Sequence, residues 1–125
     1  MDEFQFEELV GENRVESQKD SIRNLGDPED MMIQIMSILN ETVLIPEEGE
    51  TYTFIYNAKT PSIKYDQHPI VGVTDIFKWG FRGINFHWDK IRNYTWQEIP
   101  GQLHIVRQSE IQTMLDIPYA YYLTK

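Results

Sequence analysis

The chain has 125 residues, a formal net charge of −9 at pH 7 and no cysteine. This length fits one domain with at most a short arm, and the 41% hydrophobic and 13% aromatic residues indicate a folded protein. The lack of cysteine excludes a disulfide framework, a cysteine nucleophile and a thiolate zinc site. No apolar run approaches the roughly 20 residues of a membrane span, so we expect a protein made in a cytoplasm, without a membrane partner.

The negative charge is concentrated at the front of the chain. Residues 1–30 hold ten acids and three bases, whereas residues 31–125 hold ten acids and eight bases. We therefore predict an acidic arm over residues 1–26, with Phe4 and Phe6 as candidate anchors for a partner. A solvated acidic tail without a partner is the alternative interpretation of this segment.

A helix signal is clear just after this arm. Asp27 is a suitable N-cap and Pro28 fits the first helical position, and two acidic residues follow at the positive end of the helix dipole. We therefore predict a helix over about residues 28–40, inside an assembly segment of residues 27–42.

The predicted helix is apolar around most of its circumference, because only Gln34 and Ser37 interrupt its run of large apolar residues. A small domain covers one face of such a helix, so we expect a second protein to cover the other, and three methionines suit an adaptable contact surface. A central core helix is the alternative interpretation. The candidate partner-binding residues of this segment are Met31, Met32, Ile35, Met36 and Leu39.

The pattern changes to the two-residue period of β-strands after Glu50. Gly83, inside one predicted strand, indicates a bulge or a close backbone approach. Because five short strands expose edges unless they close, we predict a mainly β chain: a five-stranded SH3-like barrel over residues 43–125, preceded by an extended acidic arm and one apolar helix. An oligonucleotide-fold barrel is the alternative. The expected strands are residues 51–58, 70–77, 81–88, 102–107 and 119–123, with a loop or short helical turn at 89–101 and a short helix at about 110–115.

No motif for catalysis or metal binding stands out in the sequence. The candidate metal ligands are His68, His87, His104, Asp66, Asp75 and Asp89. No HExxH or paired HxH motif aligns them. The sequence also has neither a GxSxG nucleophile motif nor a phosphate-binding glycine loop. We therefore predict a protein that is not an enzyme and holds no metal or cofactor.

Bases and aromatic residues interleave between residues 81 and 96. We interpret this stretch as a protein interface, because tryptophan, tyrosine and arginine dominate interface hot spots. The alternative is a DNA-contacting surface for end protection or single-strand binding, formed by Arg82, Lys90 and Arg92 with nearby aromatics. The chain lacks the clustered bases that phosphate binding needs, which disfavours nucleic acid. The candidate partner-binding residues here and at the C-terminus are Trp88, Arg92, Trp96, Tyr121 and Tyr122.

A family pattern spans about residues 46–92. A tyrosine-aspartate-x-x-proline step is followed by an aromatic strand, a glycine-isoleucine-asparagine-x-histidine strand and a basic residue; the matching positions are Tyr65, Asp66, Pro69, Gly83, Ile84, Asn85, His87 and Arg92. The chain thereby resembles small structural and DNA-end-protecting proteins of contractile-tailed (myovirus-type) bacteriophages.

The resemblance implies a non-enzymatic virion protein of the baseplate, tail or neck, made in the host cytoplasm. Its partners would be other virion proteins, and it would be present in several copies in a symmetric assembly. The chain departs from the family pattern at Trp88 and Asp89, where a tyrosine and a proline-rich step are expected. It also lacks the basic character of a DNA-end binder, which argues against end protection as its main role.

Overall fold

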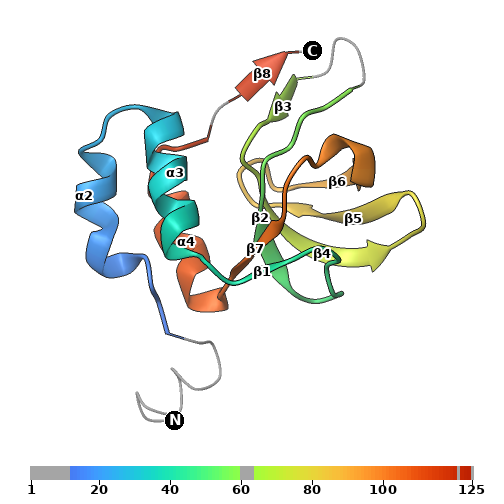
Figure 1. The fold of residues 1–125 in the computed structure, drawn as a ribbon, viewed down its shortest axis with the longest axis horizontal. Coiled ribbons are helices and arrows are strands. Elements are labelled where there is room, and N and C mark those ends of the chain that lie inside the picture. The colour runs from blue at the N-terminus through green and yellow to red at the C-terminus, as the bar shows by residue number, and fades with distance from the viewer. Residues whose placement is uncertain (1–11, 60–63, 121, 125) are drawn as a thin grey trace.

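The computed structural model describes residues 12–59, 64–120 and 122–124, and these form a helical layer beside a layer of strands (Figure 1). The helices are η1 (Glu16–Gln18), α2 (Lys19–Arg23), α3 (Pro28–Ile38), η2 (Trp96–Glu98), η3 (Gln108–Glu110) and α4 (Ile111–Leu115). The strands are β1 (Thr42–Val43), β2 (Thr51–Thr53), β3 (Lys64–Asp66), β4 (Ile70–Ile76), β5 (Gly80–Asn85), β6 (Lys90–Thr95), β7 (Leu103–Val106) and β8 (Tyr122–Thr124).

Six strands make one antiparallel sheet in the order β1-β7-β2-β4-β5-β6, and β3 pairs with β8 apart from it. The prediction of a mainly β chain is confirmed. The five-stranded SH3-like barrel is not, because the sheet has six strands and does not close: β1 and β6 are its edges. The prediction of a loop or short helical turn at residues 89–101 is wrong for β6 (Lys90–Thr95), which is a strand, whereas η2 (Trp96–Glu98) is a short helical turn within that range. Only Tyr94 of that strand is buried, so apolar alternation does not mark it in the sequence.

The hairpin that joins β4 to β5 contains Gly83, the glycine predicted to mark a bulge or a close backbone approach. A Cβ atom built on Gly83 would lie 2.5 Å from Val71 Cγ1 and 2.6 Å from the carbonyl oxygen of Gly72. The predicted close backbone approach is therefore confirmed. The irregularity in pairing lies on the other strand of the hairpin, where the register shifts between Val73 and Asp75.

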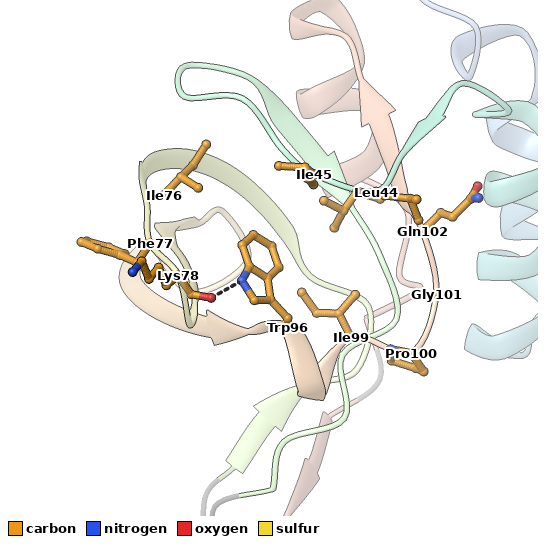
Figure 2. Close-up of a pocket in the computed structure, with 11 residues that line it drawn as sticks. Leu44, Ile45, Ile76, Phe77, Lys78, Trp96, Ile99, Pro100, Gly101 and Gln102 are labelled. Atoms are coloured by element: carbon orange, nitrogen blue, oxygen red, sulfur yellow. Dashed lines mark hydrogen bonds between the residues drawn. The ribbon is translucent and has the colours of Figure 1, made fainter.

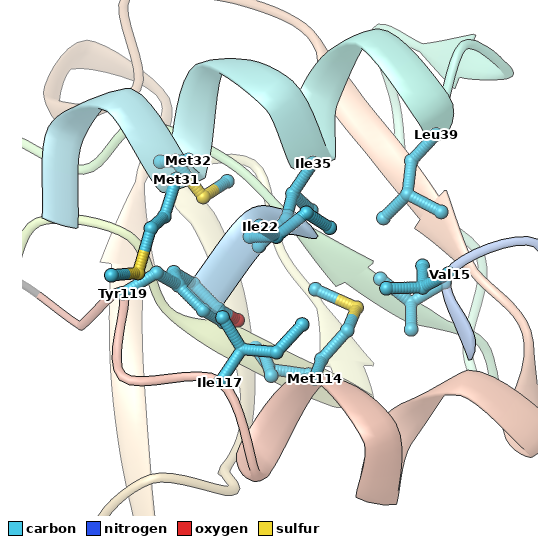
Figure 3. Packing of buried hydrophobic residues seen from close by; sticks show 11 residues of the cluster. Val15, Ile22, Met31, Met32, Ile35, Leu39, Met114, Ile117 and Tyr119 are labelled. Carbon is cyan, nitrogen blue, oxygen red and sulfur yellow. The ribbon is translucent and has the colours of Figure 1, made fainter. Parts of the chain in front are cut away.

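Helix α3 begins at Pro28, as the capping residues predict, and the backbone N–H of Asp30 donates to Asp27 Oδ2 at 3.4 Å. One side of α3 faces the interior of the helical layer (Figure 3). There it meets apolar side chains from the segment before it and from the C-terminal segment of the chain. The buried residues that it meets include Val15, Ile22, Met114, Ile117 and Tyr119.

The expectation that a second protein covers the apolar face of α3 is wrong for its central residues. Met31, Met32, Ile35 and Leu39 are at most 2% exposed, and Met36 packs against the same cluster. These five candidate partner-binding residues are core residues, because the chain's own helices α2 and α4 pack over them. The alternative interpretation, a central core helix, agrees with the structure.

Residues 12–26 are part of the fold and do not form an extended arm. Val15 and Ile22 are fully buried in the helical core. Arg14 donates from Nε and Nη2 to the two carboxylate oxygens of Glu110, both at 2.9 Å, and the Glu110 side chain is 0% exposed. Burial opposes the ionisation of Glu110, but hydrogen bonds from Arg14 and from the backbone N–H of Arg107 outweigh it and lower the pKa of this carboxyl group.

A second, aromatic cluster fills the sheet side of the molecule. The Tyr94 ring lies 5.4 Å from both Phe54 and Phe81 and 4.9 Å from Tyr56, measured between ring centroids. This cluster gives β6 its one buried anchor and holds it against the rest of the sheet. In the part of the chain that the structure describes, no helix has the length and apolar character needed to cross a membrane.

Candidate functional site: an apolar groove and a basic hollow

An apolar groove of about 700 Å³ lies at the end of the sheet (Figure 2). Three segments form its walls: the loop after β1, the turn between β4 and β5, and the stretch from η2 to the start of β7. Its lining residues are Leu44, Ile45, Ile76, Phe77, Lys78, Trp96, Ile99, Pro100, Gly101, Gln102 and Leu103.

Two aliphatic side chains on the wall of this groove are largely exposed. Leu44 is 73% exposed and Ile45 is 69% exposed. Next to the groove, Trp79 is 42% exposed and stacks on Phe77 at 4.8 Å between ring centroids. Single exposed apolar residues are ordinary on a protein surface, but a contiguous apolar patch around a depression is typical of an interaction site.

Trp96 is held in a fixed position in the groove. Its indole Nε1 donates to the carbonyl oxygen of Lys78 at 2.7 Å, as the dashed line in Figure 2 marks. The helical turn that carries it is capped, since the Thr95 hydroxyl donates to Glu98 Oε1 at 2.6 Å and the Lys59 N–H donates to Glu98 Oε2 at 2.8 Å. A rigid aromatic side chain loses little entropy on binding, so this residue is a suitable anchor point for a partner.

The electrostatics of Glu98 agree with this capping role. Burial disfavours the charged form, but the hydrogen bonds from Thr95 and Lys59 outweigh that effect and keep the pKa of Glu98 below its ordinary value. The carboxylate is therefore ionised at neutral pH and keeps η2 in place. These hydrogen bonds therefore hold the part of the groove wall that η2 forms.

A second depression, of about 330 Å³, is lined by Lys64, Trp88, Lys90 and Arg92, and we call it the basic hollow. The guanidinium carbon of Arg92 lies 4.6 Å from the ring centroid of Trp88, a cation–π contact. The predicted interface residues Trp88 and Arg92 are thus adjacent, whereas Trp96 lies in the apolar groove. Lys64 joins the basic hollow from β3, and no local sequence signal links it to β6.

The three bases of the predicted DNA surface do not form one patch. Arg82 lies opposite Asn93 in the β5–β6 ladder, whereas Arg92 lies opposite Gly83. Because side chains alternate between the two faces of a sheet, Arg82 is on the other face from Lys90 and Arg92. Its Nε donates to Asn93 Oδ1 at 3.0 Å, and its guanidinium carbon lies 5.3 Å from the Phe77 ring centroid.

The histidines and aspartates of the sequence are only partly brought together. Asp66 contacts His87 Nδ1 through Oδ2 and accepts the backbone N–H of His68 at 2.9 Å through Oδ1. Both ring nitrogens of His68 are buried without a hydrogen-bond partner among the described residues, and burial lowers the pKa of this ring. His104 lies elsewhere, against the carbonyl oxygen of Leu39.

The remaining candidate ligands lie apart from this cluster. Asp75 Oδ2 accepts the hydroxyl hydrogen of Thr74 at 2.9 Å, and Asp89 has a positive φ of 54° in the turn before β6. Within residues 12–59, 64–120 and 122–124, no group of three histidine, cysteine, aspartate or glutamate residues is arranged to hold a metal ion. The Asp66–His87 pair is therefore best described as a buried link between β3 and the end of β5.

Several residues of the groove were not singled out by sequence reasoning. Leu44 and Ile45 form a short apolar pair before Pro46, which is the one local signal that could have marked them. Lys78 and Ile99 carry no such signal. Of the other predicted interface residues, Phe4, Phe6 and Tyr121 lie outside the described residues, as does the side chain of Tyr122.

We compared the chain with protein-family models, with curated proteins and with solved structures, and it matches none of them. The function is therefore argued from the geometry of this chain.

Proposed function

We propose that this chain is a non-enzymatic structural protein of a contractile-tailed phage particle, and that its apolar groove binds an apolar segment of a neighbouring virion subunit. The observation that carries the proposal is the groove itself, with Leu44 and Ile45 more than two thirds exposed on its wall. The proposed partner is another protein of the baseplate, tail or neck.

The chemistry of the groove favours a protein segment over a reacting substrate. Within the described part of the chain, its lining holds one charged side chain, Lys78, and one amide side chain, Gln102; the other lining side chains are apolar. Such a surface offers area for apolar burial, and among the lining residues Lys78 has no carboxylate or histidine beside it with which to act in catalysis. At about 25 cal/mol per Å² of buried apolar area, burial would supply most of the binding energy.

The phage part of the proposal rests on the sequence pattern that includes Tyr65, Asp66 and His87. The structure supplies a physical reason for such a pattern, since Asp66 links the backbone of His68 to the ring of His87 in the interior. This buried contact stabilises the fold, which is compatible with a protein that binds its partners through its surface and not through these residues.

The test is binding to the proteins encoded by the neighbouring genes, with groove variants. The double variant Leu44→Asp with Ile45→Asp places two charges in the groove, and Ile33→Asp is the matched control, because Ile33 is 64% exposed on α3 outside the groove. We expect the groove variant to bind the neighbouring subunit at least about thirtyfold more weakly, the size of a hot-spot loss. The control should bind within about twofold of the original chain.

Two outcomes would contradict the proposal. One is equal loss of binding in the control and the groove variant, which would show that the groove is not the contact. The other is that the neighbouring genes encode no virion protein that binds this chain. Circular dichroism of each variant verifies that it is folded before the binding is compared.

A further inference from the structure

We propose that the edge strand β6 and the basic hollow beside it bind the acidic N-terminal segment of a second copy of this chain, residues 2–8. This surface is separate from the apolar groove and would join copies of the chain to one another. The starting observation is that, among the residues that the structure describes, β6 is the last strand of the six-stranded sheet and pairs with β5 alone. An edge strand presents backbone N–H and C=O groups to which an extended segment can add.

The charges beside β6 favour an acidic partner. Lys90 and Arg92 lie on β6, and Lys64 lies across the hollow from them. Within the part of the chain that the structure describes, no ion pair joins Lys90 or Arg92 to a carboxylate, in contrast to Arg14 and Arg107 on the helical side. In a chain with a net charge of −9, a site of three adjacent bases attracts a negatively charged segment.

The sequence of the N-terminal segment matches the two faces of β6. Residues 2–8 read Asp-Glu-Phe-Gln-Phe-Glu-Glu, so that acidic or amide side chains alternate with two phenylalanines over residues 3–7. On β6, Lys90 and Arg92 share one face, and Ile91, which is 68% exposed, lies on the other.

Two antiparallel registers satisfy both faces at once. In the first, Glu3 lies beside Arg92 while Phe4 lies beside Ile91. In the second, Glu7 lies beside Lys90 while Phe6 lies beside Ile91. A slip by one residue would place phenylalanine beside the cations and an acidic or amide side chain beside Ile91, so the alternation excludes the registers that lie one residue away from these two.

A second copy is favoured as the source of this segment. Glu12, the first described residue, is held on the helical side of the molecule, where its carbonyl oxygen accepts from Arg107 Nη1 at 3.0 Å. Strand β6 lies on the opposite side of the molecule, beyond the centre of the sheet (Figure 1). A segment from a neighbouring copy reaches this edge without crossing the molecule, and repetition of the contact builds a head-to-tail assembly.

Nucleic acid is the competing occupant, and the geometry disfavours it. Arg82 lies on the other face of the sheet, which leaves three bases in the hollow. The electrostatic affinity for a phosphate backbone scales with the number of phosphates neutralised, so three bases give a weak site on a strongly acidic protein. An extended peptide also uses the backbone groups of β6, whereas a nucleic acid does not.

The experiment titrates a labelled peptide of residues 1–11 onto the full chain by fluorescence anisotropy. We expect saturable binding that weakens at least about tenfold when the chain carries Lys90→Glu and Arg92→Glu, or when the peptide carries Phe4→Ala and Phe6→Ala. Arg82→Glu is the matched control on the opposite face and should change the affinity by less than about twofold. A peptide with Glu3→Lys and Glu7→Lys should bind the charge-reversed chain more tightly than the original peptide does.

Sedimentation of the full chain tests whether the contact joins copies. The average mass should rise with concentration, and the substitutions Phe4→Ala and Phe6→Ala should abolish the rise. The groove variant Leu44→Asp with Ile45→Asp should still bind the peptide, so failure of this inference is distinguishable from failure of the groove proposal. The inference is overturned by no peptide binding at about 1 mM, by equal loss in the Arg82→Glu control, or by a single-stranded DNA that binds the hollow more tightly than the peptide.

Discussion

The contact between Arg14 and Glu110 predicts how much the docking of residues 12–26 contributes to the free energy of unfolding. The Glu110 side chain is 0% exposed and that of Arg14 is 16% exposed. The variant Arg14→Met keeps most of the aliphatic stem but removes both guanidinium hydrogen bonds to the carboxylate. Two backbone donors, the N–H groups of residues 14 and 107, still reach Glu110, at 2.7 Å and 2.8 Å.

The expected loss of stability follows from the hydrogen bonds that Arg14→Met removes and those that remain on Glu110. Removing one partner of a buried ion pair costs about 3–5 kcal/mol, and the two remaining backbone donors place the expected loss near the lower end, at about 3 kcal/mol. For a domain of this size, that corresponds to a fall in Tm of roughly 10 °C. Urea unfolding followed by circular dichroism measures the free energy, with Lys19→Met as the control, because the Lys19–Asp116 pair is more exposed.

The pH dependence gives a second readout of the same contact. The pKa of Glu110 in the folded chain lies below its ordinary value of about 4.5. The stability from its ionised form is therefore present above pH 4.5 and is lost as the pH falls below it. The difference between the original chain and Arg14→Met should shrink over that range. If Arg14→Met were as stable as Lys19→Met at pH 7, residues 12–26 would not be docked as described.

Two further predictions concern the buried part of the sheet side. Burial lowers the pKa of His68, so the unfolded chain takes up a proton first and the free energy of unfolding falls as the pH drops below about 6.5. The variant His68→Leu should flatten this pH dependence in urea titrations from pH 7.5 to 5.5, and an unchanged slope would show that another group controls it. The variant Gly83→Ala should lower the free energy of unfolding by about 3 kcal/mol, because the new Cβ would lie 2.5 Å from Val71 Cγ1. The control Gly101→Ala, whose Cβ would have no atom within 4 Å, should leave it nearly unchanged in the same assay, and equal effects would refute the close approach.

Local signals were enough to predict several elements. The Asp27-Pro28 start of α3 and the β-branched run of β4 are marked within a few residues, and the structure contains both. The close approach of Gly83 to β4 was also foreseeable, because a glycine inside a strand indicates a bulge or a close backbone approach. These features depend on backbone preferences that act over one turn or one hairpin.

The remaining errors have a common physical cause, which is contact over long sequence separations. The apolar face of α3 was assigned to a partner because the residues that cover it, such as Met114 and Tyr119, are about 80 positions further along the chain. Arg14 meets Glu110 across 96 positions, which no local pattern shows. Strand β6 was missed because it is an edge strand with only Tyr94 buried.

In the candidate site, too, some residues could be predicted from the local sequence, whereas others are brought together only by the fold. Trp96 was predicted from residue type alone, and the structure places it in the groove with Lys78. The rest of the groove is assembled from three segments that the sheet brings together, so Leu44 and Ile99 have no shared sequence signal. Likewise, Lys64 reaches the basic hollow only because β3 lies near the start of β6.

The most direct test of the central claim is amide hydrogen exchange of the full chain, alone and bound to the neighbouring virion subunit. Docking through the apolar groove predicts new protection in the loop that contains Leu44 and Ile45 and in residues 96–101, with exchange in α3 unchanged. New protection over Pro28–Ile38, with the groove segments exchanging as they do in the free chain, would contradict the account.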